Sequence, residues 1–315
     1  MFLISLILMA GALALFLIYG LNLGIDFTGG SLMEVEFRST NYELGKIRES
    51  LEKVGINNAV VSQSGDRGVI IKMPEINEEK HQEILAELKK IGDLEEKRFD
   101  SIGSVLGAEL KRKSITAIII ALVLISIYLA VVFSRVGQVI SPWALALGGI
   151  VALLHDLLLP IGVFAWLGQF KGVAIDAPMI AAALAILGYS INDTVVVYDR
   201  IRENIIKHNA NMRIDVPIRS KRIEDPRFLN KSGRFEEIGT NDANKFSGII
   251  HQSIKQTLVR SINTTLTTLF AVIAIYIFGG PTLKNFSLAL IIGIASGAYS
   301  SIFVASPILM IFHKK

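Results

Sequence analysis

The 315-residue sequence contains no cysteine, which excludes disulfides, thiolate metal sites and cysteine nucleophiles. Its five histidines show no metal-ligand spacing. It also lacks a nucleophile elbow, a P-loop and a dinucleotide fingerprint, since Gly24, Gly29 and Gly30 do not fit G-x-G-x-x-G. We therefore expect a protein that is not an enzyme and holds no metal or cofactor. Any energy source is expected to be external or a proton gradient.

Charged residues are scarce and unevenly placed. They make up 19% of the chain, against 51% hydrophobic residues, whereas soluble domains carry about 25% charged residues. Residues 24–110 hold 11 Lys and Arg against 17 Asp and Glu, and residues 200–257 hold 12 against 7. Apolar runs between such blocks are typical of membrane spans alternating with aqueous segments. The basic block therefore indicates the cytoplasmic side of a lipid bilayer and not a nucleic-acid partner.

Six apolar runs are predicted to span the membrane, because a spanning helix needs about 20 mostly apolar residues. The first, at 2–20, lacks the basic start and the cleavage site of a signal peptide, so we interpret it as a true span. The other five runs are 115–133, 143–166, 174–198, 262–279 and 286–312.

The predicted organisation is a polytopic α-helical membrane protein with an extracytoplasmic domain between the first two of six transmembrane helices. Lysine and arginine near the span ends, including Arg135 and Lys314-Lys315, place both termini in the cytoplasm, although Lys111-Arg112-Lys113 opposes the rule. The predicted segments are helix 1 (1–23), the outer domain (24–113), helices 2–4 (114–199), a basic cytoplasmic loop with an amphipathic helix (200–257) and helices 5–6 (258–315).

The outer domain is predicted to be a small α+β fold. Residues 31–37 alternate with the period of a strand, and residues 42–54 and 77–91 have helical spacing. Further strands are expected at 59–61, 69–71 and 94–102. The resulting βαββαβ order is the ferredoxin-like pattern. The side chains of the second helix expected to face inward are Ile84, Leu85, Leu88 and Ile91.

The basic block between the fourth and fifth spans divides into two parts. Residues 209–244 are polar, so we interpret them as a largely irregular loop. Residues 246–259 regain helical spacing and are expected to lie along the membrane surface before the fifth span.

Asp193 is the strongest candidate for a functional residue. A carboxylate within an apolar run is costly and often marks an ion or proton path. Ser190, Asp193 and Thr194 share one helical face, and Asn192 adds to the polar character of this segment. The alternative interpretation is that Asp193 is hydrated and structural, near the cytoplasmic end of its helix.

Arg260 begins the fifth span and forms a polar stripe with Thr264 and Thr267. Since Asp193 and Arg260 both lie toward the cytoplasmic ends of their helices, we hypothesise an ion pair that couples helix motion to proton uptake. The alternative is that Arg260 anchors its helix at the membrane interface.

His155 and Asp156 lie near the middle of the third span. Adjacent residues project about 100° apart on a helix, so these two are not expected to share one partner. Asp156 is interpreted either as a second relay carboxylate or as a buried group that fixes helix packing, and His155 belongs to the same candidate relay.

Several motifs resemble the SecF family. Residues 23–30 (LGIDFTGG) resemble the SecD/SecF motif after the first span, and residues 191–204 (INDTVVVYDRIREN) resemble the SecF signature at the end of the fourth. Residues 260–268 resemble its fifth span. The matching motif positions are Gly24, Asp26, Phe27, Gly29, Gly30, Asp199, Arg200 and Arg202.

This resemblance implies a resistance-nodulation-division-like unit formed with SecD in the bacterial inner membrane. Such a unit associates with the SecYEG channel and uses the proton-motive force to help move preproteins. The positions that match the family's proton coupling are Asp193 and Arg260. Residues 209–244 form a longer connection than is usual in the family.

Two other functions remain open from the sequence. One alternative is a subunit of a related proton-driven small-molecule or lipid transporter, although a self-sufficient pump should carry twice the number of spans predicted here. The other is a scaffold of the translocon that transduces no energy. A scaffold is expected to tolerate Asp193→Asn.

Overall fold

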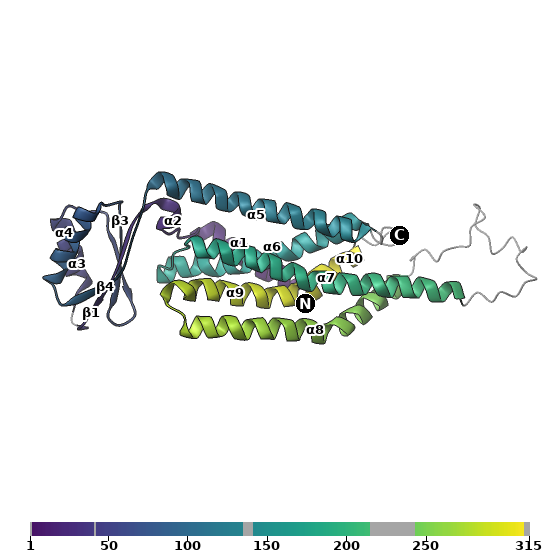
Figure 1. Ribbon diagram of the computed structural model, residues 1–315. Coiled ribbons are helices and arrows are strands. Elements are labelled where there is room, and N and C mark those ends of the chain that lie inside the picture. Colours follow the sequence, from purple (N-terminus) through teal and green to yellow (C-terminus); the bar gives the residue numbers. More distant parts are fainter. Residues whose placement is uncertain (1, 41, 135–140, 215–242, 312–315) are drawn as a thin grey trace, which may run out of the picture. The chain divides into compact units, whose positions relative to one another are not determined.

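The computed structural model describes residues 2–40, 42–134, 141–214 and 243–311 (Figure 1). The chain divides into two compact units. The helical unit comprises Met1–Leu15, Ile118–Val163 and Ala181–Lys315. The sheet unit comprises Phe16–Ala117 and Phe164–Ile180.

Between Gly30 and Ile102 of the sheet unit, the described residues form four strands and two helices in the βαββαβ order expected from the sequence. All strand pairs are antiparallel, in the order β2-β3-β1-β4. Two antiparallel neighbours therefore cover both edges of β1. The elements are β1 (Gly30–Phe37), α3 (Leu44–Lys53), β2 (Val60–Ser64), β3 (Gly68–Met73), α4 (Glu78–Lys89) and β4 (Leu94–Ile102).

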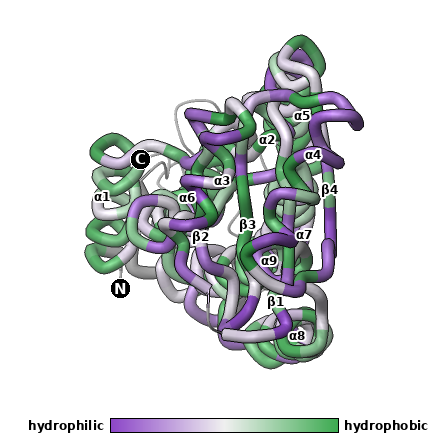
Figure 2. Tube along the Cα trace, turned by 90° about the vertical axis from the view of Figure 1, so that its left-hand side faces the viewer, coloured by the Kyte–Doolittle hydropathy of each residue, from purple (hydrophilic) through white to green (hydrophobic). Residues whose placement is uncertain are grey.

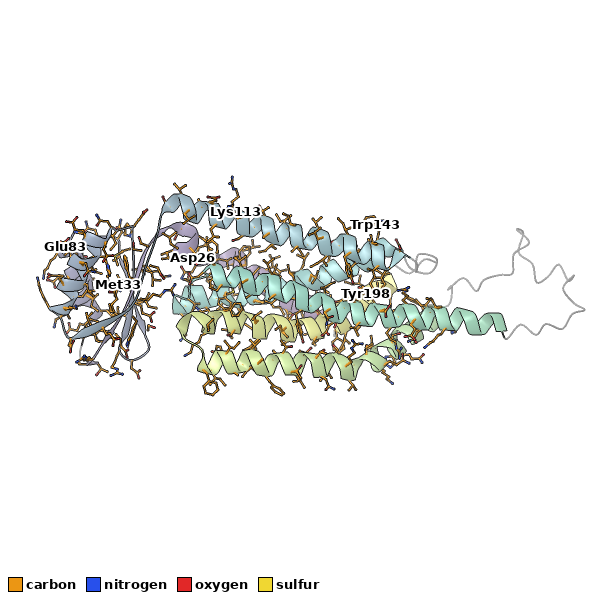
Figure 3. The ribbon with its side chains drawn as sticks, in the orientation of Figure 1. Asp26, Met33, Glu83, Lys113, Trp143 and Tyr198 are labelled. Atoms are coloured by element: carbon orange, nitrogen blue, oxygen red, sulfur yellow. The ribbon has the colours of Figure 1, made fainter. Side chains whose placement is uncertain are left out.

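One face of this sheet packs against α3 and α4. Met33, labelled in Figure 3, lies opposite Ile71 in the register of β1 and β3, and both side chains are fully buried. They belong to one apolar cluster with Ile47 of α3 and Ile84 of α4. Every second strand residue therefore faces the helices and packs against the apolar stripes of α3 and α4. Of the predicted inward side chains, Ile84, Leu85 and Leu88 are buried and Ile91 is half-buried.

Five helices in the described residues are long and apolar enough to cross a membrane. A shorter apolar helix, α1 (Phe2–Tyr19), precedes them and is mostly hydrophobic along its length (Figure 2). The chain is therefore mostly helical with a small sheet. The long helices are α5 (Ser104–Val132), α6 (Pro142–Lys171), α7 (Ala177–Ile214), α8 (Ala243–Phe278) and α9 (Pro281–Ser300), the last continuing through a π-helical turn (Ser301–Ala305) into α10 (Ser306–Ile311).

The basic segment between α7 and α8 differs from the prediction. α7 continues to Ile214 and α8 begins at Ala243, so residues 209–214 are helical and not irregular. Within the described residues, 246–259 form no helix separate from the α8 span, because α8 runs without a break from Ala243 to Phe278. Phe246 and Ile250 of α8 are buried in one cluster with Ile201 and Ile205 of α7. Mutual burial of these two apolar stripes explains why the helices extend. The remaining predicted loop, 215–242, lies outside the described residues.

Candidate functional site

Asp193 lies on α7 with only 2% of its surface exposed. Its Oδ2 accepts hydrogen bonds from Ser261 Oγ at 2.9 Å and from Thr265 Oγ1 at 3.3 Å. Both donors are on α8 and are themselves buried. Because they are four residues apart, they lie on the same face of that helix. Two neutral hydroxyl groups, and no cation, therefore bind this carboxylate within the described residues.

The hypothesised ion pair between Asp193 and Arg260 is not formed in this structure. Arg260 is exposed, and none of the ion pairs among the described residues joins it to Asp193. Arg260 precedes Ser261 by one residue, a turn of about 100° around the helix. When Ser261 faces Asp193, Arg260 therefore points elsewhere.

The predicted polar stripe lies on the same exposed side of α8. Thr264 and Thr267 are exposed, and their hydroxyls donate to backbone carbonyls of their own helix. The buried stripe is Ser261 and Thr265, which the sequence analysis missed. The signal was present, because these two hydroxyl residues have the same spacing of four.

A second buried carboxylate, Asp156, lies on α6 with its side chain fully buried. Its Oδ2 accepts hydrogen bonds from Ser190 Oγ of α7 at 2.5 Å and from Ser300 Oγ of α9 at 2.6 Å. Its Oδ1 accepts a hydrogen bond from Ser296 Oγ of α9 at 2.6 Å. His155 Nδ1 lies 2.9 Å from the same Oδ1. One carboxylate therefore joins three helices, and we call it and these four partners the Asp156 cluster.

The expectation that His155 and Asp156 do not share a partner is wrong. Ser296 Oγ lies 3.2 Å from His155 Nδ1 and 2.6 Å from Asp156 Oδ1. The two side chains bend toward each other, and one serine from α9 reaches both. Ser296 and Ser300 were missed, although their spacing of four in an apolar run marks a polar face.

The other predicted lining residues differ in their burial and in their hydrogen-bond partners. Ser190 donates to Asp156, while Thr194 is fully buried and bonds to the Ser190 carbonyl. Asn192 is exposed. Only part of this polar segment therefore faces the buried carboxylates.

The glycine-rich motif after α1 binds the segment between α6 and α7 within the sheet unit. Gly24 N donates to the Ile175 carbonyl at 2.8 Å. Asp26, labelled in Figure 3, accepts at Oδ2 from Ala177 N at 2.6 Å, at the beginning of α7. Phe27, in the short helix α2 (Ile25–Thr28), is buried. The carboxylate of Asp26 thus satisfies a backbone donor at a helix N-terminus.

Asp176, beside this contact, is half-buried. Burial raises the pKa of the Asp176 carboxyl, and the neighbouring Asp26 carboxylate raises it further. Asp100 acts in the same direction, whereas Lys72 and Arg98 oppose the rise. The folded chain therefore holds this proton more tightly than the unfolded chain. As a result, the Asp176 contribution to the free energy of unfolding falls as the pH rises from the ordinary pKa through the raised one.

Replacing Asp176 by asparagine is expected to stabilise the chain relative to the wild type at neutral pH. The advantage should shrink on acidification and vanish below a pH of about 4, where Asp176 becomes protonated in the unfolded chain as well. Unfolding midpoints of the full chain in detergent, measured over a pH series, test this. Asp66→Asn, at an exposed turn residue, is the matched control. An identical pH dependence of Asp176→Asn and wild type would contradict the prediction.

The second motif joins α7 to α8 beyond Asp193. Arg200 Nε donates to Gln256 Oε1 at 2.8 Å and Arg200 also pairs with Glu203. Arg202 pairs with Asp199 at 3.5 Å. Of these contacts, the Arg200–Gln256 hydrogen bond joins α7 to α8, whereas the two ion pairs lie within α7. No group of three or more acidic or histidine residues able to hold a metal occurs in the described part of the chain.

Comparison with known proteins identifies relatives of the whole chain. Residues 81–220 and 234–315 match the family "Protein export membrane protein SecD/SecF, C-terminal", and residues 14–40 match the SecD/SecF GG motif. The protein translocase subunit SecF of Thermobaculum terrenum is 37% identical, covering 100% of this chain and 92% of its own length. The Pseudomonas aeruginosa SecF subunit is 33% identical, covering 98% and 87%.

A solved structure of a related protein also matches this chain. The crystal structure of SecDF, a translocon-associated membrane protein from Thermus thermophilus, matches with a TM-score of 0.75 and 31% identity. The match covers 96% of this chain but 36% of that SecDF chain. The chain therefore belongs to the SecD/SecF family of protein export membrane proteins.

Proposed function

We propose that this chain is a SecF-like subunit that, together with SecD, uses the proton-motive force to promote preprotein translocation through the SecYEG channel. The observation that carries the proposal is the setting of Asp193. A carboxylate inside an apolar bundle is costly and is a candidate proton carrier. Its partners, Ser261 and Thr265, are hydroxyl groups that can donate or accept. They can therefore bond to Asp193 in either protonation state, as a proton carrier requires.

The exposed face of α8 supports a partner within the membrane. Arg260, Asn263, Thr264 and Thr267 are all exposed on a helix apolar enough to span. Polar side chains at membrane depth normally face other protein or a water-filled cavity. This chain corresponds to only part of SecDF, which supports a SecD-like partner on this face. Arg260 would then meet a group of SecD and not Asp193.

We place the chain in the bacterial inner membrane with six spans and both termini in the cytoplasm. α1, with 18 residues, is about 27 Å long at 1.5 Å per residue, close to the roughly 30 Å of a hydrocarbon core. Counting α1 as a span places the sheet domain outside the cytoplasm, between helices 1 and 2. The antiparallel order β2-β3-β1-β4 supports a ferredoxin-like fold for this domain.

The decisive experiment is preprotein export in vesicles holding this protein, SecD and SecYEG, with and without a proton gradient. Asp193→Asn is expected to abolish the gradient-dependent part of export, because an amide of similar size keeps the contacts but carries no titratable proton. Asp66→Asn, the same substitution at an exposed turn, is expected to leave export unchanged.

Full gradient dependence in Asp193→Asn, with normal assembly, would show that the chain is a scaffold that transduces no energy. Gradient-driven movement of a small molecule or lipid without any preprotein would favour the transporter alternative. No specific contact in the described residues favours either alternative.

A further inference from the structure

The Asp156 cluster contains one buried polar atom, His155 Nε2, for which the described residues provide no hydrogen-bond partner. His155 is fully buried, and its Nε2 has no hydrogen-bond partner among the described residues. Its other nitrogen, Nδ1, lies 2.9 Å from Asp156 Oδ1. Buried polar atoms are nearly always hydrogen-bonded, so an exception at a candidate relay requires a reason.

Counting the hydrogen-bond donors and acceptors around Asp156 shows which nitrogen of the His155 imidazole carries the hydrogen. Three serine hydroxyls at 2.5–2.6 Å contact the two Asp156 oxygens. Asp156 in its ionised form accepts from all three hydroxyls and from a proton on His155 Nδ1. Nδ1 must then carry the hydrogen, which leaves Nε2 of the neutral ring as a bare lone pair. A hydrogen on Nε2 would instead be an unsatisfied buried donor, which is the costlier arrangement.

The same accounting shows where an added proton is accommodated. A proton placed on Asp156 would add a donor to a carboxyl group already surrounded by donors. A proton placed on His155 Nε2 displaces no existing hydrogen bond, although the new N–H has no acceptor among the described residues; what favours this site is therefore the charge. The product is an imidazolium beside a carboxylate, so the net charge of the pair changes from −1 to zero. Burying a neutral pair is less costly than burying an isolated negative charge.

We propose that His155 Nε2 is the atom that takes up the proton in the Asp156 cluster, while Asp156 stays ionised as its fixed counter-charge. This inference rests on the proposed function, in which the chain carries protons. From the sequence, Asp156 is the candidate relay carboxylate. In this proposal Asp156 instead keeps its negative charge, and His155 carries the proton.

The surroundings of His155 contain few other titratable groups. Asp156 is its neighbour on α6, and Tyr299 of α9 stacks on its ring with centroids 6.1 Å apart. From α1, Ser5 Oγ donates to the Tyr299 hydroxyl at 3.1 Å. From α7, Ser190 reaches only the carboxylate. Asp156 is therefore the one charged group in hydrogen-bond contact with the ring among the described residues.

Nitrogen-15 solid-state NMR of histidine-labelled full-length protein in liposomes tests the assignment directly, because protonated and bare ring nitrogens have well-separated shifts. His155→Asn identifies the signal by removing it. At alkaline pH, His155 is expected to show a protonated Nδ1 and a bare Nε2. On acidification, Nε2 should gain a proton. A protonated Nε2 at alkaline pH, or a ring that stays neutral at every pH where the chain remains folded, would overturn the proposal.

The export assay gives an independent functional reading. In His155→Asn, the introduced amide nitrogen can replace the donor at Nδ1 but offers no titratable nitrogen. We expect this variant to lose the gradient-dependent part of export, while His251→Asn, at an exposed histidine on α8, keeps it.

The two proposals fail in distinguishable ways. If His155→Asn keeps gradient-dependent export and Asp193→Asn loses it, the inference is wrong and the proposed function stands. If wild-type export shows no gradient dependence, the proposed function is wrong, and the NMR titration still decides where the proton binds. Should His155→Asn fail to fold, replacing the other four histidines leaves His155 as the one histidine of the chain, and its spectra at two pH values retain the test.

Discussion

Replacing Gly29 by alanine is expected to destabilise the motif that joins α1 to the sheet domain by about 3 kcal/mol or more. Gly29 has φ 74° and ψ 173°, a backbone region occupied essentially by glycine. An added Cβ would also lie 2.6 Å from the Ser104 Cα, at the beginning of α5. A contact this short with backbone cannot be relieved by rotating a side chain. Strain and overlap therefore act together.

Gly45→Ala is the matched control for this substitution. Gly45 lies within α3 of the same domain, is exposed, and has no atom within 4 Å of the added Cβ. Gly45 is the second residue of α3, and alanine has the higher helix propensity, so a small effect of the opposite sign is expected. Hydrogen exchange of residues 25–37, measured by mass spectrometry on the full chain, should accelerate only in Gly29→Ala. Unchanged exchange there would show that the backbone at Gly29 is not constrained.

Replacing Asp156 by alanine is expected to cost about 3 kcal/mol or more of stability in the helical unit. The substitution removes the acceptor of Ser190, Ser296 and Ser300 at once, together with the partner of His155. Each buried polar group left unsatisfied costs about 1–3 kcal/mol, although rotated hydroxyls recover part of this. We expect a large drop in the unfolding midpoint measured in detergent.

Asp156→Asn separates loss of hydrogen bonds from loss of charge. The asparagine carbonyl still accepts, and a serine hydroxyl can rotate to accept from the amide nitrogen. Its loss of stability should therefore be a small fraction of that of Asp156→Ala. Equal losses would indicate that the negative charge, and not the hydrogen bonds, stabilises the packing of α6, α7 and α9.

The sequence alone predicted the long apolar helices and the βαββαβ order of the sheet domain, because both depend on local periodicity. Apolar side chains spaced by two or by about 3.6 residues must lie on one face of their own element wherever it packs. The sequence also marked Asp193 and Asp156, since the cost of a carboxylate in an apolar run does not depend on the partner. The lengths of α7 and α8 were not predictable, because Ile201 and Phe246 are buried together from distant parts of the chain.

Only the tertiary structure decided which side chains satisfy these carboxylates. Ser261 and not Arg260 faces Asp193, because one residue along α8 is a rotation of about 100°, and helix packing sets that rotation. Likewise, Ser296 and Ser300 reach Asp156 from α9, about 140 residues further along the chain. Local spacing identifies the polar face of each helix, but the contacts among α6, α7, α8 and α9 determine which polar faces meet.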